Sequence, residues 1–122
     1  MPKIVMSTTE QMKSFNKFFL TLFASLFLAL PAWAVDVTMG SNMNLIFEPN
    51  DITINAGDTI RFVNDALPPH NVIVEDYPNL SHDGLAFSPG ESFEITFPDP
   101  GDYTFWCDPH KGAGMTGTIH VN

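Results

Sequence analysis

The chain has 122 residues, 5 Lys and Arg against 14 Asp and Glu, a formal net charge of −9 and a sequence pI near 4.5. This length fits one domain, and the acidic balance excludes a nucleic-acid binder, because neutralising phosphates requires a basic face. The single cysteine excludes an internal disulfide framework and the zinc sites that need two or more cysteines. Apolar residues make up 44% of the chain and charged residues 16%, so the chain can bury a core.

The N-terminal segment, residues 1–34, has the pattern of a secretory signal peptide. Lys13 and Lys17 precede an apolar run over residues 18–30, and a small-residue cleavage pattern ends at Ala34. The run is shorter than the roughly 20 residues that a membrane-spanning helix needs. We therefore expect residues 1–34 to be removed and residues 35–122 to form the domain; an uncleaved N-terminal anchor is the alternative.

The remaining chain has the pattern of short strands, because apolar residues alternate with other residues along it. This alternation occurs at Ile52 and Ile54; Ile60 and Phe62; Val72 and Val74; Phe93, Ile95 and Phe97; Tyr103, Phe105 and Cys107; and Ile119 and Val121. Two further short strands are expected over residues 36–40 and 43–47, whereas residues 75–87 are the least regular part. Turns rich in Gly, Pro and Asp separate the segments. The pattern predicts an all-β fold, an antiparallel Greek-key β-sandwich of seven to eight strands.

A group of soft metal donors follows one of these strands. Cys107, His110 and Met115 supply a thiolate, an imidazole and a thioether within a short segment, CDPHKGAGM. Thiolate and thioether select copper, and imidazole suits both of its oxidation states. Two His, one Cys and a weak axial Met form the blue-copper electron-transfer site. The spacing therefore indicates a copper site that still needs a second His.

His70 is the candidate for this second His. It stands just before the strand at Val72 and follows two prolines, Pro68 and Pro69, which restrict the backbone. The bond between these prolines is a candidate cis peptide. His82 and His120 lack such a pattern, and we expect both at the surface.

Two segments, PPHNV at residues 68–72 and YTFWCDPHKGAGMTG at residues 103–117, carry a family resemblance. They resemble the plastocyanins, small type 1 blue copper proteins of the cupredoxin family in photosynthetic electron transport, and in particular the cyanobacterial ones. The resemblance spans residues 35–122 and implies a cupredoxin-like fold. It implies one copper ion, cycling between Cu(I) and Cu(II), with the ligands His70, Cys107, His110 and Met115. Asn71 is expected to link the His70 turn to the Cys107 loop and to donate near the sulfur.

The resemblance also implies a function and partners. We expect a soluble electron carrier, not an enzyme, that moves single electrons from cytochrome f of the cytochrome b6f complex to photosystem I. Contacts would be transient, the chain monomeric, and the exported chain neither inserted into the membrane nor bound to nucleic acid. The expected compartment is the thylakoid lumen, with the periplasm as the alternative. The expected partner contacts are Leu67, Pro68, Trp106, Lys111, Gly112 and Ala113.

Two features depart from the plastocyanin pattern. Trp106 stands where these proteins usually have Tyr, and the stretch between His70 and Cys107 is shorter than in typical members. Three other functions stay open: a periplasmic cupredoxin of a respiratory or amine-oxidising chain, a copper storage or delivery module, and a metal-free adhesive sandwich. The last leaves the spacing of Cys107 and the following glycines unexplained.

Overall fold

The computed structural model describes residues 33–122. Residues 1–32 of the predicted signal peptide lie outside the described residues. Within the described part, no helix has the length and apolar character needed to cross a membrane.

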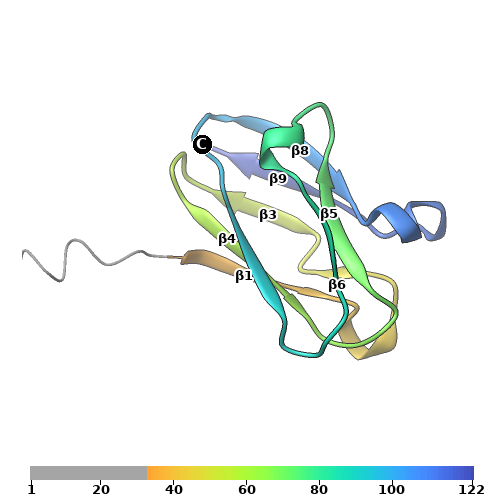
Figure 1. The fold of residues 1–122 in the computed structure, drawn as a ribbon. Coiled ribbons are helices and arrows are strands. Elements are labelled where there is room, and N and C mark those ends of the chain that lie inside the picture. The colour runs from red at the N-terminus through yellow and green to blue at the C-terminus, as the bar shows by residue number, and fades with distance from the viewer. Residues whose placement is uncertain (1–32) are drawn as a thin grey trace, which may run out of the picture. The chain divides into compact units, whose positions relative to one another are not determined.

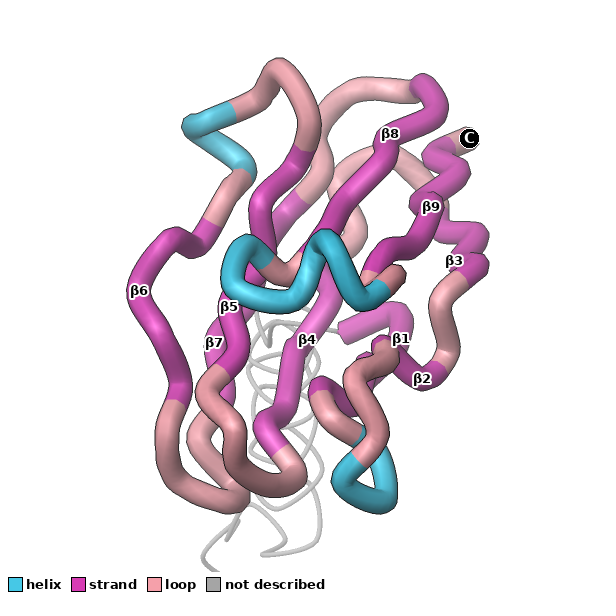
Figure 2. The backbone as a smooth tube through the Cα atoms, turned by 90° about the vertical axis from the view of Figure 1, so that its right-hand side faces the viewer, coloured by secondary structure: helices cyan, strands magenta, loops and turns pink. Residues whose placement is uncertain are grey.

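The described residues form two sheets (Figures 1 and 2). The first has the strand order β2-β1-β4-β7 and the second the order β3-β9-β8-β5-β6. The strands in the described part are β1 (Trp33–Met39), β2 (Phe47–Glu48), β3 (Asp51–Ile54), β4 (Thr59–Asn64), β5 (His70–Val74), β6 (His82–Ala86), β7 (Ser92–Thr96), β8 (Gly101–Trp106) and β9 (Thr116–Val121). Three short 3-10 turns connect them: η1 (Ser41–Met43), η2 (Pro78–Leu80) and η3 (Asp108–Ala113).

The predicted all-β sandwich is confirmed, with differences in pairing and strand number. Most neighbouring strands are antiparallel, but β1 pairs with β4 and β3 pairs with β9 in parallel. The parallel pairs arise because the chain crosses between the two sheets before it returns to the same sheet. Residues 33–122 contain nine strands, where the alternation predicted seven to eight.

Strand β6 is the one that the alternation missed, because it lies at the edge of its sheet and its first four residues are exposed. The strand expected over residues 43–47 is replaced largely by η1 and a loop. Asn42 and Met43 have positive φ angles, which a strand does not allow, and only Phe47 enters β2. The sequence analysis named the bond between Pro68 and Pro69 as the candidate cis peptide, but the cis bond is the preceding one, between Leu67 and Pro68.

The core between the sheets contains an aromatic cluster. The ring of Phe105 on β8 lies 4.7 Å from that of Phe47 and 5.9 Å from that of Phe62, between ring centroids, and all three side chains are buried. Such inclined ring pairs add to the favourable burial of apolar area. The cluster fixes β8 two residues before Cys107, so the packing of the core sets the position of the predicted copper donor.

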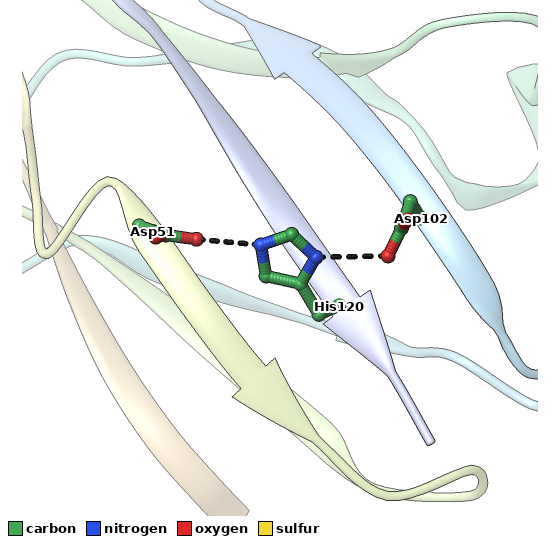
Figure 3. A network of polar contacts seen from close by, with 3 residues as sticks. All are labelled: Asp51, Asp102 and His120. Atoms are coloured by element: carbon green, nitrogen blue, oxygen red, sulfur yellow. Dashed lines mark hydrogen bonds and ion pairs between the residues drawn. The ribbon is translucent and has the colours of Figure 1, made fainter.

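Two histidines outside the predicted site lie at the surface, as expected, but both have partners. The His120 ring on β9 lies between two carboxylates (Figure 3): Nδ1 is 2.8 Å from Oδ1 of Asp102 on β8, and Nε2 is 2.8 Å from Oδ1 of Asp51 on β3. His82 on β6 stacks on Phe93 of the other sheet, with ring centroids 3.7 Å apart. Neither ring belongs to the group of converging donors, and each links neighbouring strands.

Candidate metal centre

The four predicted copper ligands lie at the ends of three adjacent strands of the second sheet and in the turn between two of them. His70 begins β5, and Cys107 directly follows the end of β8. His110 lies in η3, and Met115 directly precedes β9. Figure 1 shows η3, in blue, beyond the end of β8. Adjacent strands and one tight turn thus bring together residues that are far apart in the sequence.

The donor atoms of three of these residues converge. One ring nitrogen of His70, one of His110 and Sγ of Cys107 all lie within 4.8 Å of one another. Sγ of Cys107 is 3.7 Å from Nδ1 of His70 and 3.4 Å from Nδ1 of His110. Each His presents the same nitrogen, Nδ1, to the sulfur, so one ion among the three atoms could bind them all.

The loop that carries three of the ligands is closed by its own backbone. The amide of Cys107 donates to the carbonyl of Met115 at 3.0 Å, and the amide of Met115 donates to the carbonyl of His110 at 3.2 Å. Gly114 ends η3 with a φ of 89°, a left-handed conformation that favours glycine. Met115 is fully buried beside this hydrogen-bonded base. The loop therefore places Met115, the thioether residue, in the buried part of the site.

Asn71 connects the two halves of the site. Its Oδ1 accepts a hydrogen bond from the backbone amide of Asp108 at 2.8 Å, and its Nδ2 donates to the carbonyl of Asp83 at 3.0 Å. The side chain is almost completely buried. It thus joins β5, which begins with His70, to the first residue after Cys107.

Burial is the main cause of the pKa shifts at Cys107 and His70. It raises the pKa of the Cys107 thiol, against the opposing effect of the backbone N–H groups of Asn71 and His110. Burial, followed by the neighbouring His110, lowers the pKa of His70. A neutral imidazole is ready to bind a cation, and a bound metal ion replaces the thiol proton. The soft, buried donor set of two imidazoles, one thiol and a nearby thioether fits copper.

Gly40 is a site residue that the sequence analysis missed. It is buried at the end of β1, with a φ of 79°, and a Cβ atom there would overlap Nε2 of His70. A side chain at this position would displace the imidazole. No local pattern identifies Gly40, because its contact is with a residue far along the chain.

The predicted partner-contact residues adjoin the ligands His70, Cys107 and His110 along the chain. Leu67, Pro68, Lys111, Gly112 and Ala113 are exposed, with Leu67 at 56%, and His110 is half-buried. Trp106 is also half-buried and borders a cavity of about 390 Å³ whose lining includes the acidic residues Glu75, Asp76 and Asp83. His110 is therefore the one ligand of the four that reaches the surface, and a hollow with acidic residues in its lining lies next to Trp106.

Comparison with known proteins gives relatives for the whole described part. The profile of copper binding proteins of the plastocyanin/azurin family matches residues 33–122. A chloroplastic plastocyanin of Oryza sativa is 44% identical over 108 residues, which cover 81% of this chain and 70% of the relative. A plastocyanin of Prochlorothrix hollandica is 44% identical over 102 residues, which cover 76% of this chain and 78% of the relative.

Solved structures with the same fold include a plastocyanin and an amicyanin. A mutant plastocyanin of a fern has a TM-score of 0.65 and 31% identity, over 71% of this chain and 99% of the other. An amicyanin of Paracoccus versutus has a TM-score of 0.61 and 28% identity, over 78% of this chain and 87% of the other. Both similarities extend over most of the other chain.

Proposed function

The chain belongs to the plastocyanin/azurin family of copper-binding proteins, and from this premise we propose that it carries single electrons from cytochrome f of the cytochrome b6f complex to photosystem I. The observation that carries the proposal is the convergence of two His Nδ1 atoms on one buried Cys Sγ in a relative of plastocyanins. The plastocyanin relatives support the more general statement, that the chain is a blue copper electron carrier.

The residues of the chain hold copper rather than expose it to a substrate. When bound by His70, Cys107, His110 and Met115, copper supplies a one-electron couple between Cu(I) and Cu(II). The backbone bonds of the ligand loop and the Asn71 link hold the donors in one arrangement. Four protein donors leave no open position for a substrate, which favours a carrier over a copper-dependent enzyme.

The surface around His110 suits brief contact with redox partners. His110 is the ligand with the greatest exposure in the described set, and the neighbouring Leu67, Pro68, Gly112 and Ala113 carry no charge. An uncharged patch over an electron donor allows close approach without long-lived ion pairs. We assign these residues, together with Lys111 and Trp106, as the partner contact, and the chain acts as a monomer.

The proposed compartment is the thylakoid lumen. Two observations support it: the signal-peptide pattern at the N-terminus and the relatedness to plastocyanins, among them chloroplastic ones. The periplasm is the alternative compartment, since the same export pattern leads there.

A second candidate function is that of a periplasmic cupredoxin in a respiratory or amine-oxidising chain. The similarity to amicyanin, 28% identical, favours it, whereas 44% identity to plastocyanins favours the photosynthetic role. A copper storage or delivery module needs an open site that releases the ion, which the buried Cys107 does not favour.

The test measures how fast the reduced, copper-loaded protein gives its electron to photosystem I and to a bacterial cytochrome c. We expect fast, saturable oxidation by photosystem I and slow reaction with the cytochrome. Leu67→Asp should slow the photosystem I reaction at least tenfold, because it puts a charge into the apolar patch. Leu85→Asp, at another exposed apolar position on β6, is the matched control and should change it little. Preference for the cytochrome would favour the second candidate.

A further inference from the structure

The side chain of Lys111 lies on the indole of Trp106. Its Nζ is 3.7 Å from the centre of the ring, within the range of a cation–π contact, for which indole is the best partner. Lys111 directly follows the ligand His110, and Trp106 directly precedes the ligand Cys107. The contact thus joins the sequence neighbours of two copper ligands.

We propose that Lys111 is a positioning residue for the copper site, and that its contact with Trp106 holds the His110 turn against the end of β8. The proposal rests on the copper assignment of the proposed function and adds a role for a residue outside the ligand set. Lys111 acts through His110, because its own ammonium lies on the Trp106 ring.

Trp106 is held in place by the strands on both sides of β8. Trp106 is the last residue of β8, and it pairs with Ile73 of β5 on one side and with Thr116 of β9 on the other. Its ring is half-buried. Since successive side chains of a strand point to opposite faces, Trp106 faces outward where Cys107 faces the core. The indole therefore lies on the outer face of a strand that is hydrogen-bonded on both sides.

The turn that bears His110 needs such an anchor at its outer part. Residues 111–114 are all exposed, and two of them are glycines. The amide of Gly114 donates to the carbonyl of Lys111, which closes the turn on itself but does not attach it to the sheets. The hydrogen bonds that reach the sheets lie at its two ends: the amide of Asp108 donates to Asn71 of β5, and the carbonyl of Gly114 accepts from the amide of Thr116 of β9.

His110 and Lys111, which are neighbours in the sequence, therefore contact the end of β8 on its two opposite faces. On the inner face, Nδ1 of His110 lies 3.4 Å from Sγ of Cys107. On the outer face, the Lys111 ammonium lies on Trp106. Rotation of the turn about its base would break both contacts, so the outer contact restricts the imidazole on the inner side.

The test compares Lys111→Met, which keeps an unbranched side chain without charge, with Lys111→Arg, which keeps the cation–π contact. Ser92→Asp, an exposed position on β7, is the control because it changes the net charge by the same amount as Lys111→Met. The first readout is amide hydrogen exchange of Gly114 and Met115 in the copper-free protein. We expect about two- to fivefold faster exchange in Lys111→Met and wild-type exchange in Lys111→Arg and Ser92→Asp.

The second readout is the visible absorption of the copper(II) form, which reports the arrangement of the thiolate and imidazole donors. We expect the band to shift in Lys111→Met and to return to the wild-type position in Lys111→Arg. Unchanged exchange in Lys111→Met, failure of Arg to restore either readout, or an equal effect of Ser92→Asp would overturn the proposal. The exchange readout needs no copper, so failure of the copper assignment and failure of the Lys111 role give different results.

Discussion

Gly40 sets the space available to the His70 imidazole. Its positive φ and the overlap that a Cβ would make with Nε2 of His70 leave room only for glycine. We predict that Gly40→Ala costs about 1–2 kcal/mol of folding stability from the backbone conformation. It should also lower copper affinity about tenfold or more, because the imidazole must move. Denaturant unfolding of the copper-free chain and a copper-binding titration measure the two effects.

The control for this substitution is Gly57→Ala. Gly57 has a φ of 92°, and no atom lies within 4 Å of the place that a Cβ would take, so it carries the backbone strain without the overlap. Gly57→Ala should lose similar stability and keep wild-type copper affinity. Equal affinity in both variants would show that Gly40 has no role in placing His70.

Asn71 gives a second prediction for a single residue. Asn71→Leu leaves the amide of Asp108 and the carbonyl of Asp83 without their partner, which should cost about 1–3 kcal/mol of stability. It should also shift the copper(II) absorption, since the link between the two halves of the site is lost. Asn64→Leu removes another buried amide, bonded to Ser88, and should destabilise the fold without shifting the spectrum. A wild-type spectrum in Asn71→Leu would limit Asn71 to a structural role.

Donor chemistry made part of the site predictable from the sequence. Cys107, His110 and Met115 lie within one segment, and their atom types narrow the choice of metal. His70 was accessible because two prolines and a strand frame it. Gly40 was not, because what it provides is the absence of a side chain opposite a residue 30 positions away. The Lys111 contact was also hidden, since the direction of an exposed side chain has no local pattern.

At the scale of elements, His120 ties three strands of the second sheet. Its ring bonds Asp102 on β8 and Asp51 on β3, and these carboxylates raise the pKa of His120, the hydrogen bond with Asp102 contributing most. A raised pKa in the folded chain stabilises folding fully below the unfolded value of about 6.5. This contribution is lost as pH rises through the folded pKa.

We therefore predict that His120→Gln lowers stability at about pH 5.5 and much less at about pH 9. The measurement is the difference in unfolding free energy between the two copper-free proteins across this range. Because every other ionisable group is common to both proteins, the difference reports mainly on His120. Asp51→Asn with Asp102→Asn should remove most of the pH dependence. A difference that grows with pH would contradict the account.

The sequence predicted best the strands that have one face in the core and the other face in solvent. The alternation at Ile52 and Ile54 and at Tyr103 and Phe105 marks strands with one face in the core, β3 and β8. Strand β6 is exposed along most of its length, so burial leaves no alternation in its sequence. The parallel pairing of β1 with β4 also has no local signal, because it depends on the path of the chain between the two sheets.

At the scale of the whole molecule, the acidic surface should control the rate of electron exchange. In residues 33–122, Arg61 pairs with Asp36 at 2.6 Å and Lys111 lies on Trp106, whereas most carboxylates are exposed. We predict that a cationic inorganic oxidant reacts faster than an anionic one of matched driving force. Added salt should slow the first and accelerate the second. Stopped-flow oxidation at several ionic strengths measures this, and rates independent of salt would contradict it.

The central claim is that His70, Cys107, His110 and Met115 form one type 1 copper site. The most direct test is the visible absorption of the isolated protein during titration with copper(II), followed by reduction with ascorbate. We predict an intense blue band that saturates at about one copper per chain, bleaches on reduction and is absent in Cys107→Ala. A weak, pale spectrum in the wild-type chain, or a blue band that persists in Cys107→Ala, would contradict the account.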